Sequence, residues 1–180
     1  MNKLFFFPLL MLLLLVLISC EKVQMEPVTD SNELQEFVEF RVNPTVPFRG
    51  EYSVHTIVFP PESPCEDLGT YLLADGKSLH LGKSTWESCG SVDFGNQIPF
   101  DCSAGFGAKQ VGSMTFTAAD GSKLFGTFTG IFNGQVGCGD YLITSGNGRF
   151  TGATGEGDYE WINIEDAPNP LTFIGTVTNP

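Results

Sequence analysis

The feature that most restricts the fold of this chain is the residue pattern from Phe48 to the C-terminus. Glycine is dense there, and β-branched and aromatic residues alternate with polar ones. Turn residues recur roughly every ten residues, as they do between short strands. Alternation with a period of two is typical of strands that bury one face. Because no segment of useful length has the spacing of an amphipathic helix, the pattern predicts an all-β domain.

The strands are predicted to be consecutive antiparallel neighbours. Asp120-Gly121 marks a tight hairpin, since Asp-Gly supplies the positive φ that such a turn requires. Neighbouring strands of this kind leave unpaired edges, and closing the sheet removes them. We therefore expect a single antiparallel β-barrel of about eight strands rather than a sandwich. The segments assigned as strands are residues 49–59, 78–94 with a bend, 112–118, 123–132, 140–145, 155–164 and 171–178.

The first residues of the chain have the pattern of an export signal. Lys3 precedes an almost purely apolar run, residues 4–18. This run is shorter than the about 20 apolar residues that span a bilayer. Residues 1–19 are therefore predicted to be a signal peptide that is removed.

The end of this signal is similar to a known processing site. Leu17-Ile18-Ser19-Cys20 resembles the lipobox of bacterial lipoproteins, in which the cysteine is lipidated and becomes the new N-terminus. The resemblance implies lipid on Cys20 and attachment to a membrane through acyl chains. Glu21-Lys22 is similar to the start of many such lipoproteins. We therefore expect attachment to the outer membrane, and the sequence does not indicate on which side of that membrane the protein lies. The alternative is an ordinary signal peptide, or a signal anchor, with an incidental cysteine. An ordinary signal peptide usually ends in two small residues separated by one other residue, and Leu17 fits the lipobox better than it fits that site.

Composition restricts the partners of the mature chain. Cleavage before Cys20 removes one basic residue and leaves 8 basic against 21 acidic residues, a formal charge of −13. Such a surface is a poor partner for nucleic acid and for anionic headgroups. The rest of the chain fits one domain with a tether. We assign residues 20–46 to the lipidated N-terminus and a flexible tether, and residues 47–180 to the barrel.

The cysteines predict two disulfides. With Cys20 reserved for lipid, four remain, an even set in a compartment where disulfides persist. No pair has CxxC spacing and only two histidines are present, so no zinc site, other metal or cofactor is predicted. Three pairings are possible; the short Gly- and Pro-containing segment after Cys89 favours Cys89 with Cys102, and hence Cys65 with Cys138.

Three pieces of the sequence are similar to one barrel family. The stretch 145–157, which contains Gly-Arg-Phe-Thr-Gly-Ala-Thr-Gly, resembles a signature of bacterial proteins with an allene oxide cyclase-like barrel, and more loosely of dirigent proteins. His80-Leu81-Gly82-Lys83 and the hairpin 120–130 resemble two further parts of that family. The resemblance implies the barrel fold, but it transfers no reaction. Independently, a Gly-rich crossing with Phe150 as its apolar anchor suits a chain that folds across one end of a barrel.

Glu51 and His55 are the candidate catalytic residues. They share one face of the first predicted strand, and inside a barrel they could bind or polarise a small ligand. We favour an outward orientation, because Trp86, Val92 and Phe94 share one face of the next long strand and predict an apolar interior. No serine lies in a nucleophile elbow, and the Gly-Asp turn at 155–158 is only faintly similar to a calcium loop.

Three functions are consistent with these features. The favoured one is a lipid-anchored envelope module, non-catalytic, that binds a small apolar molecule or a partner through one end of the barrel. The first alternative is a cyclase-like or isomerase-like enzyme with Glu51 or His55 in its cavity. The second is a structural or adhesive surface protein, whose barrel interior would be filled. The oligomeric state is left open.

Overall fold

A computed structural model of the chain describes residues 44–66, 69–99, 102, 105–165 and 167–180. The predicted signal peptide, Cys20 and nearly all of the predicted tether lie outside these residues. No helix among the described residues is long and apolar enough to span a membrane. The elements are β1 (Thr45–Val58), β2 (Thr70–Ser78), β3 (Gly82–Pro99), β4 (Phe106–Ala118), β5 (Lys123–Phe132), β6 (Val136–Gly146), the 3-10 turn η1 (Gly148–Phe150), β7 (Gly155–Ile162) and β8 (Asn169–Thr178).

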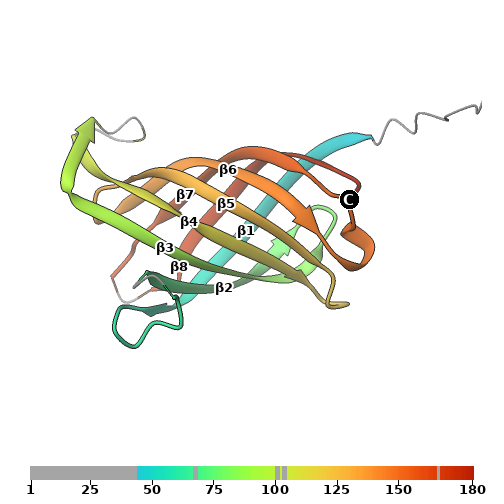
Figure 1. Ribbon diagram of the computed structural model, residues 1–180, viewed down its shortest axis with the longest axis horizontal. Coiled ribbons are helices and arrows are strands. Elements are labelled where there is room, and N and C mark those ends of the chain that lie inside the picture. Colours follow the sequence, from blue (N-terminus) through green and yellow to red (C-terminus); the bar gives the residue numbers. More distant parts are fainter. Residues whose placement is uncertain (1–43, 67–68, 100–101, 103–104, 166) are drawn as a thin grey trace, which may run out of the picture. The chain divides into compact units, whose positions relative to one another are not determined.

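The strands form a closed barrel in sequence order, with every strand antiparallel to its neighbours (Figure 1). Pairing of β8 with β1 closes it, from Thr45 opposite Thr178 to Val54 opposite Asn169. The predicted all-β, eight-stranded barrel is therefore confirmed. Among the described strands, closure gives every strand a neighbour on both sides, which explains how consecutive hairpins form a stable sheet.

One strand was not predicted. Segment 78–94 was assigned as a single bent strand, but Ser78 ends β2 and a turn with His80 at a φ of 84° leads into β3. The sequence of β2 hides its strand character, because Leu72-Leu73-Ala74 is a continuous apolar run and Gly76 interrupts the alternation.

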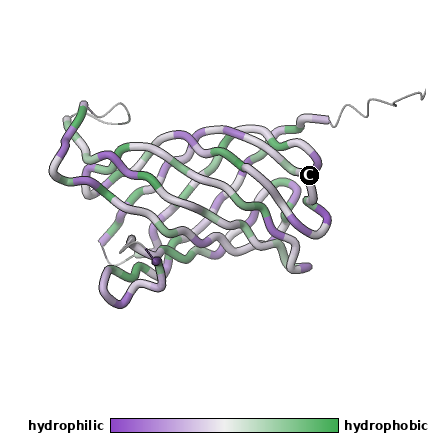
Figure 2. Tube along the Cα trace, viewed as in Figure 1, coloured by the Kyte–Doolittle hydropathy of each residue, from purple (hydrophilic) through white to green (hydrophobic). Residues whose placement is uncertain are grey.

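The barrel interior is aromatic at its centre. Phe173 contacts the rings of Tyr52, Trp86, Phe116 and Tyr141 at centroid distances of 5.0–5.9 Å. These residues come from five strands, and most contacts have the edge-to-face geometry that aromatic pairs prefer. Figure 2 shows how hydrophobic and hydrophilic segments alternate along the strands. The alternation in the sequence thus corresponds to an inner and an outer barrel face.

One end of the barrel is closed by the glycine-rich crossing. This end, at the right of Figure 1, holds the start of β1 and the β2–β3, β4–β5 and β6–β7 turns. Phe150 of η1 is fully buried there and plugs the barrel. The Arg149 guanidinium donates hydrogen bonds to the carbonyls of His80 (3.1 Å) and Leu81 (3.4 Å), which ties the crossing to the β2–β3 turn. The predicted crossing is confirmed, and we call this the closed end.

The predicted Asp-Gly hairpin joins β4 to β5 at the closed end. Gly121 has a φ of 83°, and its N–H donates to the Ala118 carbonyl at 2.9 Å. An Asp120 carboxylate oxygen accepts the Ser122 N–H at 3.0 Å. This backbone hydrogen bond is the main cause that holds the pKa of Asp120 below its usual range. The turn therefore uses both residues for the reasons expected from sequence.

The predicted disulfide pairing is wrong. The two bonds join Cys65 to Cys89 and Cys102 to Cys138, with Cα atoms 5.6 and 6.4 Å apart. The pairing was predicted from the Gly- and Pro-containing segment after Cys89, but this segment continues β3 as far as Pro99 instead of folding back. Overlooking β2 also placed Cys65 and Cys89 at opposite ends of the barrel, which hid the true partner of Cys65. With β2 present, the loops that carry Cys65 and Cys102 lie at the same end of the barrel.

Candidate binding cavity

The end opposite the closed end is open, and we call it the mouth. It carries the β1–β2, β3–β4, β5–β6 and β7–β8 connections, at the left of Figure 1. Behind it lies a cavity of about 420 Å³, a size that suits a small organic ligand. A filled interior, which the structural or adhesive alternative required, is not observed. The cavity is lined by Ile57, Phe59, Thr70, Leu72, Trp86, Ser88, Gly90, Ser91, Val92, Phe94, Gln110, Met114, Phe128, Phe132, Gly134, Tyr159, Trp161, Asn163, Leu171 and Phe173.

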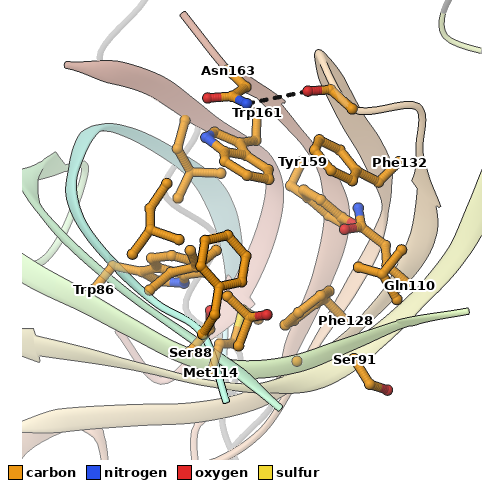
Figure 3. A pocket seen from close by; sticks show the side chains of 18 of the residues that line it. Trp86, Ser88, Ser91, Gln110, Met114, Phe128, Phe132, Tyr159, Trp161 and Asn163 are labelled. Carbon is orange, nitrogen blue, oxygen red and sulfur yellow. Dashed lines mark hydrogen bonds between the residues drawn. The ribbon is translucent and has the colours of Figure 1, made fainter. Parts of the chain in front are cut away.

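Every strand except β6 contributes to this lining. Buried Trp86, Met114 and Phe173 reach down to the aromatic centre of the barrel and form the floor. Figure 3 shows Trp86 with Ser88 on one side of the space and Tyr159 with Phe132 on the other. Most of the lining side chains are apolar. The inward face of Trp86, predicted from the alternation in β3, is confirmed.

A β-bulge at His55 brings the end of β1 into the wall. Val54 pairs with Ala74 and Thr56 with Leu73, so His55 is an extra residue on β1. Before the bulge, Tyr52 and Val54 point inward; beyond it, Ile57 lines the cavity. The bulge therefore reverses the alternation, which sequence reasoning did not predict.

Two glycines make room for the ring of Phe128. Gly90 and Gly112 pair across β3 and β4. A Cβ atom would lie 2.8 Å from the Phe128 ring at Gly90 and 2.6 Å from it at Gly112. Real Cβ atoms essentially never show contacts that short, so the Phe128 ring can pack over this part of the wall only because both residues are glycine.

A buried amide and a phenol form the polar part of one wall. Gln110 Nε2 donates to Tyr159 Oη at 2.6 Å and to the Ile131 carbonyl at 3.4 Å. Burial is the main cause that raises the pKa of Tyr159; the Gln110 hydrogen bond lowers it by a smaller amount, and the Asp140 carboxylate, the smallest of the three causes, raises it. Tyr159 is therefore protonated at neutral pH. The sequence signal for this site was a polar residue, Gln110, on the apolar face of β4.

Three donors in the cavity lining have no hydrogen-bond partner among the described residues. They are Trp86 Nε1, Ser88 Oγ and Trp161 Nε1. Trp86 and Ser88 are 4% and 3% exposed, so bulk water does not compensate them. A buried donor without a partner costs roughly 1–3 kcal/mol. Because the donor atoms themselves have almost no accessible surface, they are enclosed in the barrel wall and are not presented to a ligand in the cavity.

Glu51 and His55 do not belong to the cavity. Both lie on the outer face of the barrel, as the favoured interpretation predicted. Glu51 forms exposed ion pairs with Arg49 (3.4 Å) and Lys77 (3.9 Å), and His55 lies 3.2 Å from the Asp75 carboxylate. The enzyme alternative that placed Glu51 or His55 in a cavity is therefore wrong.

The rim of the mouth exposes large apolar side chains. Phe59, Phe94 and Phe106 are 63–65% exposed, and Ile162 at the end of β7 and Ile164 in the β7–β8 connection are also exposed. Phe94 lines the cavity entrance rather than the core, because β3 leaves its regular pairing with β4 between Asp93 and Gln97. The predicted inward orientation is thus correct for Trp86, which is buried, and for Val92, which is half-buried. It is wrong for Phe94, which is exposed.

Both disulfides lie on the outside of the barrel wall. Cys89 lies between Ser88 and Gly90, which line the cavity, so its side chain points outward. Cys138 follows Gly137, where a Cβ would meet the inward side chains of Gln110 and Trp161. The β1–β2 and β3–β4 loops are therefore fastened to the outer wall and not across the mouth.

No family model matches the sequence, and no curated protein matches it. Among solved structures, the chain is similar to a pterocarpan synthase dirigent protein, with 17% sequence identity and a TM-score of 0.43. The match covers 75% of this chain and 84% of that chain. At this identity and score, no ligand, activity or residue role is transferred. Among the described residues, no group of three His, Cys, Asp or Glu side chains could hold a metal ion.

Proposed function

We propose that this protein is a non-catalytic binding module that holds one small, largely apolar molecule in the cavity behind the barrel mouth. The observation that carries this proposal is the cavity itself, about 420 Å³, apolar and open at one end only. Burial of an apolar ligand there contributes about 25 cal/mol per Å² of apolar surface removed from water. The exposed aromatic rim extends the apolar surface to the entrance, where a ligand leaves water.

We further propose that the barrel is held at an envelope membrane by lipid on Cys20. Two or more acyl chains give lasting attachment, since each buried CH₂ contributes about 0.8 kcal/mol. The first strand of the barrel begins at Thr45, at the closed end, which is the end opposite the mouth.

The binding proposal is tested with the tryptophans of the protein, because both line the cavity. Titration with the neutral probe N-phenyl-1-naphthylamine should quench tryptophan fluorescence and raise probe emission. Val92→Arg should weaken this binding at least about tenfold, since a guanidinium at the entrance must stay hydrated. Val111→Arg is the matched control and should bind like the wild type, because Val111 does not line the cavity and is 41% exposed on the outer face of β4. Equal affinity of both variants, or no probe binding at all, contradicts the proposal.

The anchoring proposal is tested by Cys20→Ala. The substituted protein should leave the membrane fraction, or stay unprocessed with its signal peptide attached. Fractionation and intact-mass measurement of the expressed protein read both results, and the wild type should carry a mass increase that corresponds to acyl chains on Cys20. Unchanged fractionation and mass would show that Cys20 carries no lipid.

A further inference from the structure

The exposed apolar side chains of the barrel gather around its mouth. Nine large hydrophobic side chains are exposed among the described residues, and five of them form the rim: Phe59, Phe94, Phe106, Ile162 and Ile164. The other four are separated from one another on a turn and three strands: Leu79, Val111, Leu142 and Ile174. Single exposed residues need no explanation, whereas a group of them around one opening marks an interaction surface.

We infer that the rim docks onto the surface of a neutral, zwitterionic lipid bilayer, with its side chains in the lipid interface and the cavity opening toward the lipid. Docking goes beyond the proposed ligand binding, and it draws on the proposed anchor only for the reach of the tether.

The chemistry of the rim suits lipid better than a protein partner. Phe and Ile side chains carry no polar group, so they leave water without leaving a hydrogen-bond donor or acceptor unpaired. Hot spots of protein interfaces are enriched in Trp, Tyr and Arg, and none of these belongs to the rim. Phe59 and Phe94 also line the cavity entrance. A protein docked on the rim would cover this entrance, whereas a bilayer is where small apolar molecules collect.

Part of the rim projects from the end of the barrel. Phe94 and Phe106 lie on the β3–β4 hairpin, whose pairing continues past the irregularity at Asp93 as far as Pro99 opposite Phe106. Figure 1 shows the end of this hairpin as the leftmost part of the barrel. The remaining rim residues belong to the β1–β2 and β7–β8 sides of the mouth. Side chains from three separate connections thus surround one opening, an arrangement suited to an extended surface.

The charges around the mouth select the kind of lipid. Glu62 and Glu66 in the β1–β2 loop and Glu165 in the β7–β8 loop are exposed. Lys109 lies opposite Asp93 across β3 and β4, which offsets its charge. Anionic headgroups are therefore repelled from the mouth, whereas phosphatidylcholine, which has no net charge, is not.

The chain before the barrel is long enough for the mouth to reach the membrane that holds Cys20. Residues 21–44, which are 24 residues, separate Cys20 from the start of β1. Fully extended, a chain of that length spans about 80 Å. β1 has 14 residues and is about 45 Å long at the usual rise of a strand. A lipid on Cys20 would therefore keep the rim at a high effective concentration near the bilayer without preventing contact.

A tryptophan placed in the rim tests docking. Phe106→Trp puts an indole in the rim at a residue that does not line the cavity, and Ile174→Trp, at a 60% exposed position on the outer face of β8, is the matched control. Each full-length protein is mixed with vesicles of dibrominated phosphatidylcholine, whose bromine atoms quench tryptophan on contact. After subtraction of the wild-type emission, the added tryptophan of Phe106→Trp should lose emission and shift to shorter wavelength. The added tryptophan of Ile174→Trp should do neither.

The composition of the vesicles tests the choice of lipid. Replacing about one third of the brominated lipid by phosphatidylglycerol should reduce the quenching of Phe106→Trp more than the same dilution with ordinary phosphatidylcholine does, because the exposed glutamates are repelled. Stronger quenching with phosphatidylglycerol would overturn docking onto a neutral bilayer.

Probe binding without vesicles keeps docking and ligand binding apart. Phe106→Trp and Ile174→Trp should bind N-phenyl-1-naphthylamine as the wild type does, because neither residue lines the cavity. Rim quenching in a protein that binds no probe would support docking and contradict the proposed binding function. Probe binding without rim quenching would overturn docking and leave the binding function standing.

The other possible occupants of the rim give different results. Equal quenching of the two added tryptophans, or quenching of neither, overturns docking. Emission of Phe106→Trp that is already at short wavelength without vesicles also overturns it. If that emission depends on protein concentration, the rim binds a second copy of this chain; if it does not, the rim is covered by the N-terminal segment of the same chain.

Discussion

Replacing Phe173 with alanine is expected to lower the free energy of unfolding by about 3–5 kcal/mol. Phe173 is 1% exposed and contacts five aromatic rings, among them Phe116 at 5.0 Å and Tyr141 at 5.4 Å between centroids. These rings come from strands all around the barrel. The cavity that the missing Phe173 ring leaves therefore cannot close unless several strands move at once. Urea unfolding followed by tryptophan fluorescence measures the change.

Ile174→Ala is the matched control for Phe173→Ala. Ile174 is the next residue of β8, points outward and is 60% exposed, so its truncation should cost less than about 0.5 kcal/mol. Because Phe173 also lines the cavity, its loss should enlarge the floor and change probe affinity as well as stability. A destabilisation by Phe173→Ala no larger than that of Ile174→Ala would contradict the packing described here.

Removal of either disulfide is expected to cost about 3 to 4 kcal/mol. The bonded cysteines are 24 residues apart for Cys65–Cys89 and 36 apart for Cys102–Cys138, and loops of this length give that value in the chain-entropy model. Each pair is replaced by serine as a double variant, so that no free thiol remains. Urea unfolding under non-reducing conditions gives the two stabilities.

Peptide mapping without reduction checks the pairing directly. It should yield one peptide pair linked through Cys65 and Cys89 and another linked through Cys102 and Cys138. A peptide pair linked through Cys89 and Cys102, or free thiols at these four positions, would contradict the structure. The double variants provide a second check on the pairing. When serine replaces both cysteines of one disulfide, the peptide map of that variant should still show the other disulfide intact.

The sequence predicted the barrel because its main signals are local. The Asp120-Gly121 turn, the crossing anchored by Phe150 and the alternation around Trp86 each depend on neighbours along the chain. β2 escaped prediction because its apolar run and Gly76 give no clean period of two. That omission placed Cys65 and Cys89 at opposite ends of the barrel, so their bond was not predicted. The pairing Cys89 with Cys102 came instead from the Gly- and Pro-containing segment between them, which in the structure continues β3.

The cavity was less predictable than the barrel, because it depends on residues distant in sequence. Gln110 and Tyr159 form their hydrogen bond between β4 and β7, and Phe128 of β5 lies over Gly90 of β3. Neither arrangement follows from the composition of one strand. The bulge at His55 reverses the alternation through a single extra residue, which the sequence of β1 does not mark. The outward position of Glu51 was predictable, since apolar residues were available for the interior.

The order of the strands also has a kinetic consequence. All pairings except one join strands that are adjacent in sequence, and such hairpins form early because each closes only a short loop of chain. The exception is the seam between β1 and β8, which joins the two ends of the described barrel. Its formation requires the longest loop closure among the described strand pairings, and we therefore expect it to be slower than hairpin formation. Until the seam forms, β1 and β8 are both open edges, and the nascent barrel is exposed to pairing with a second chain.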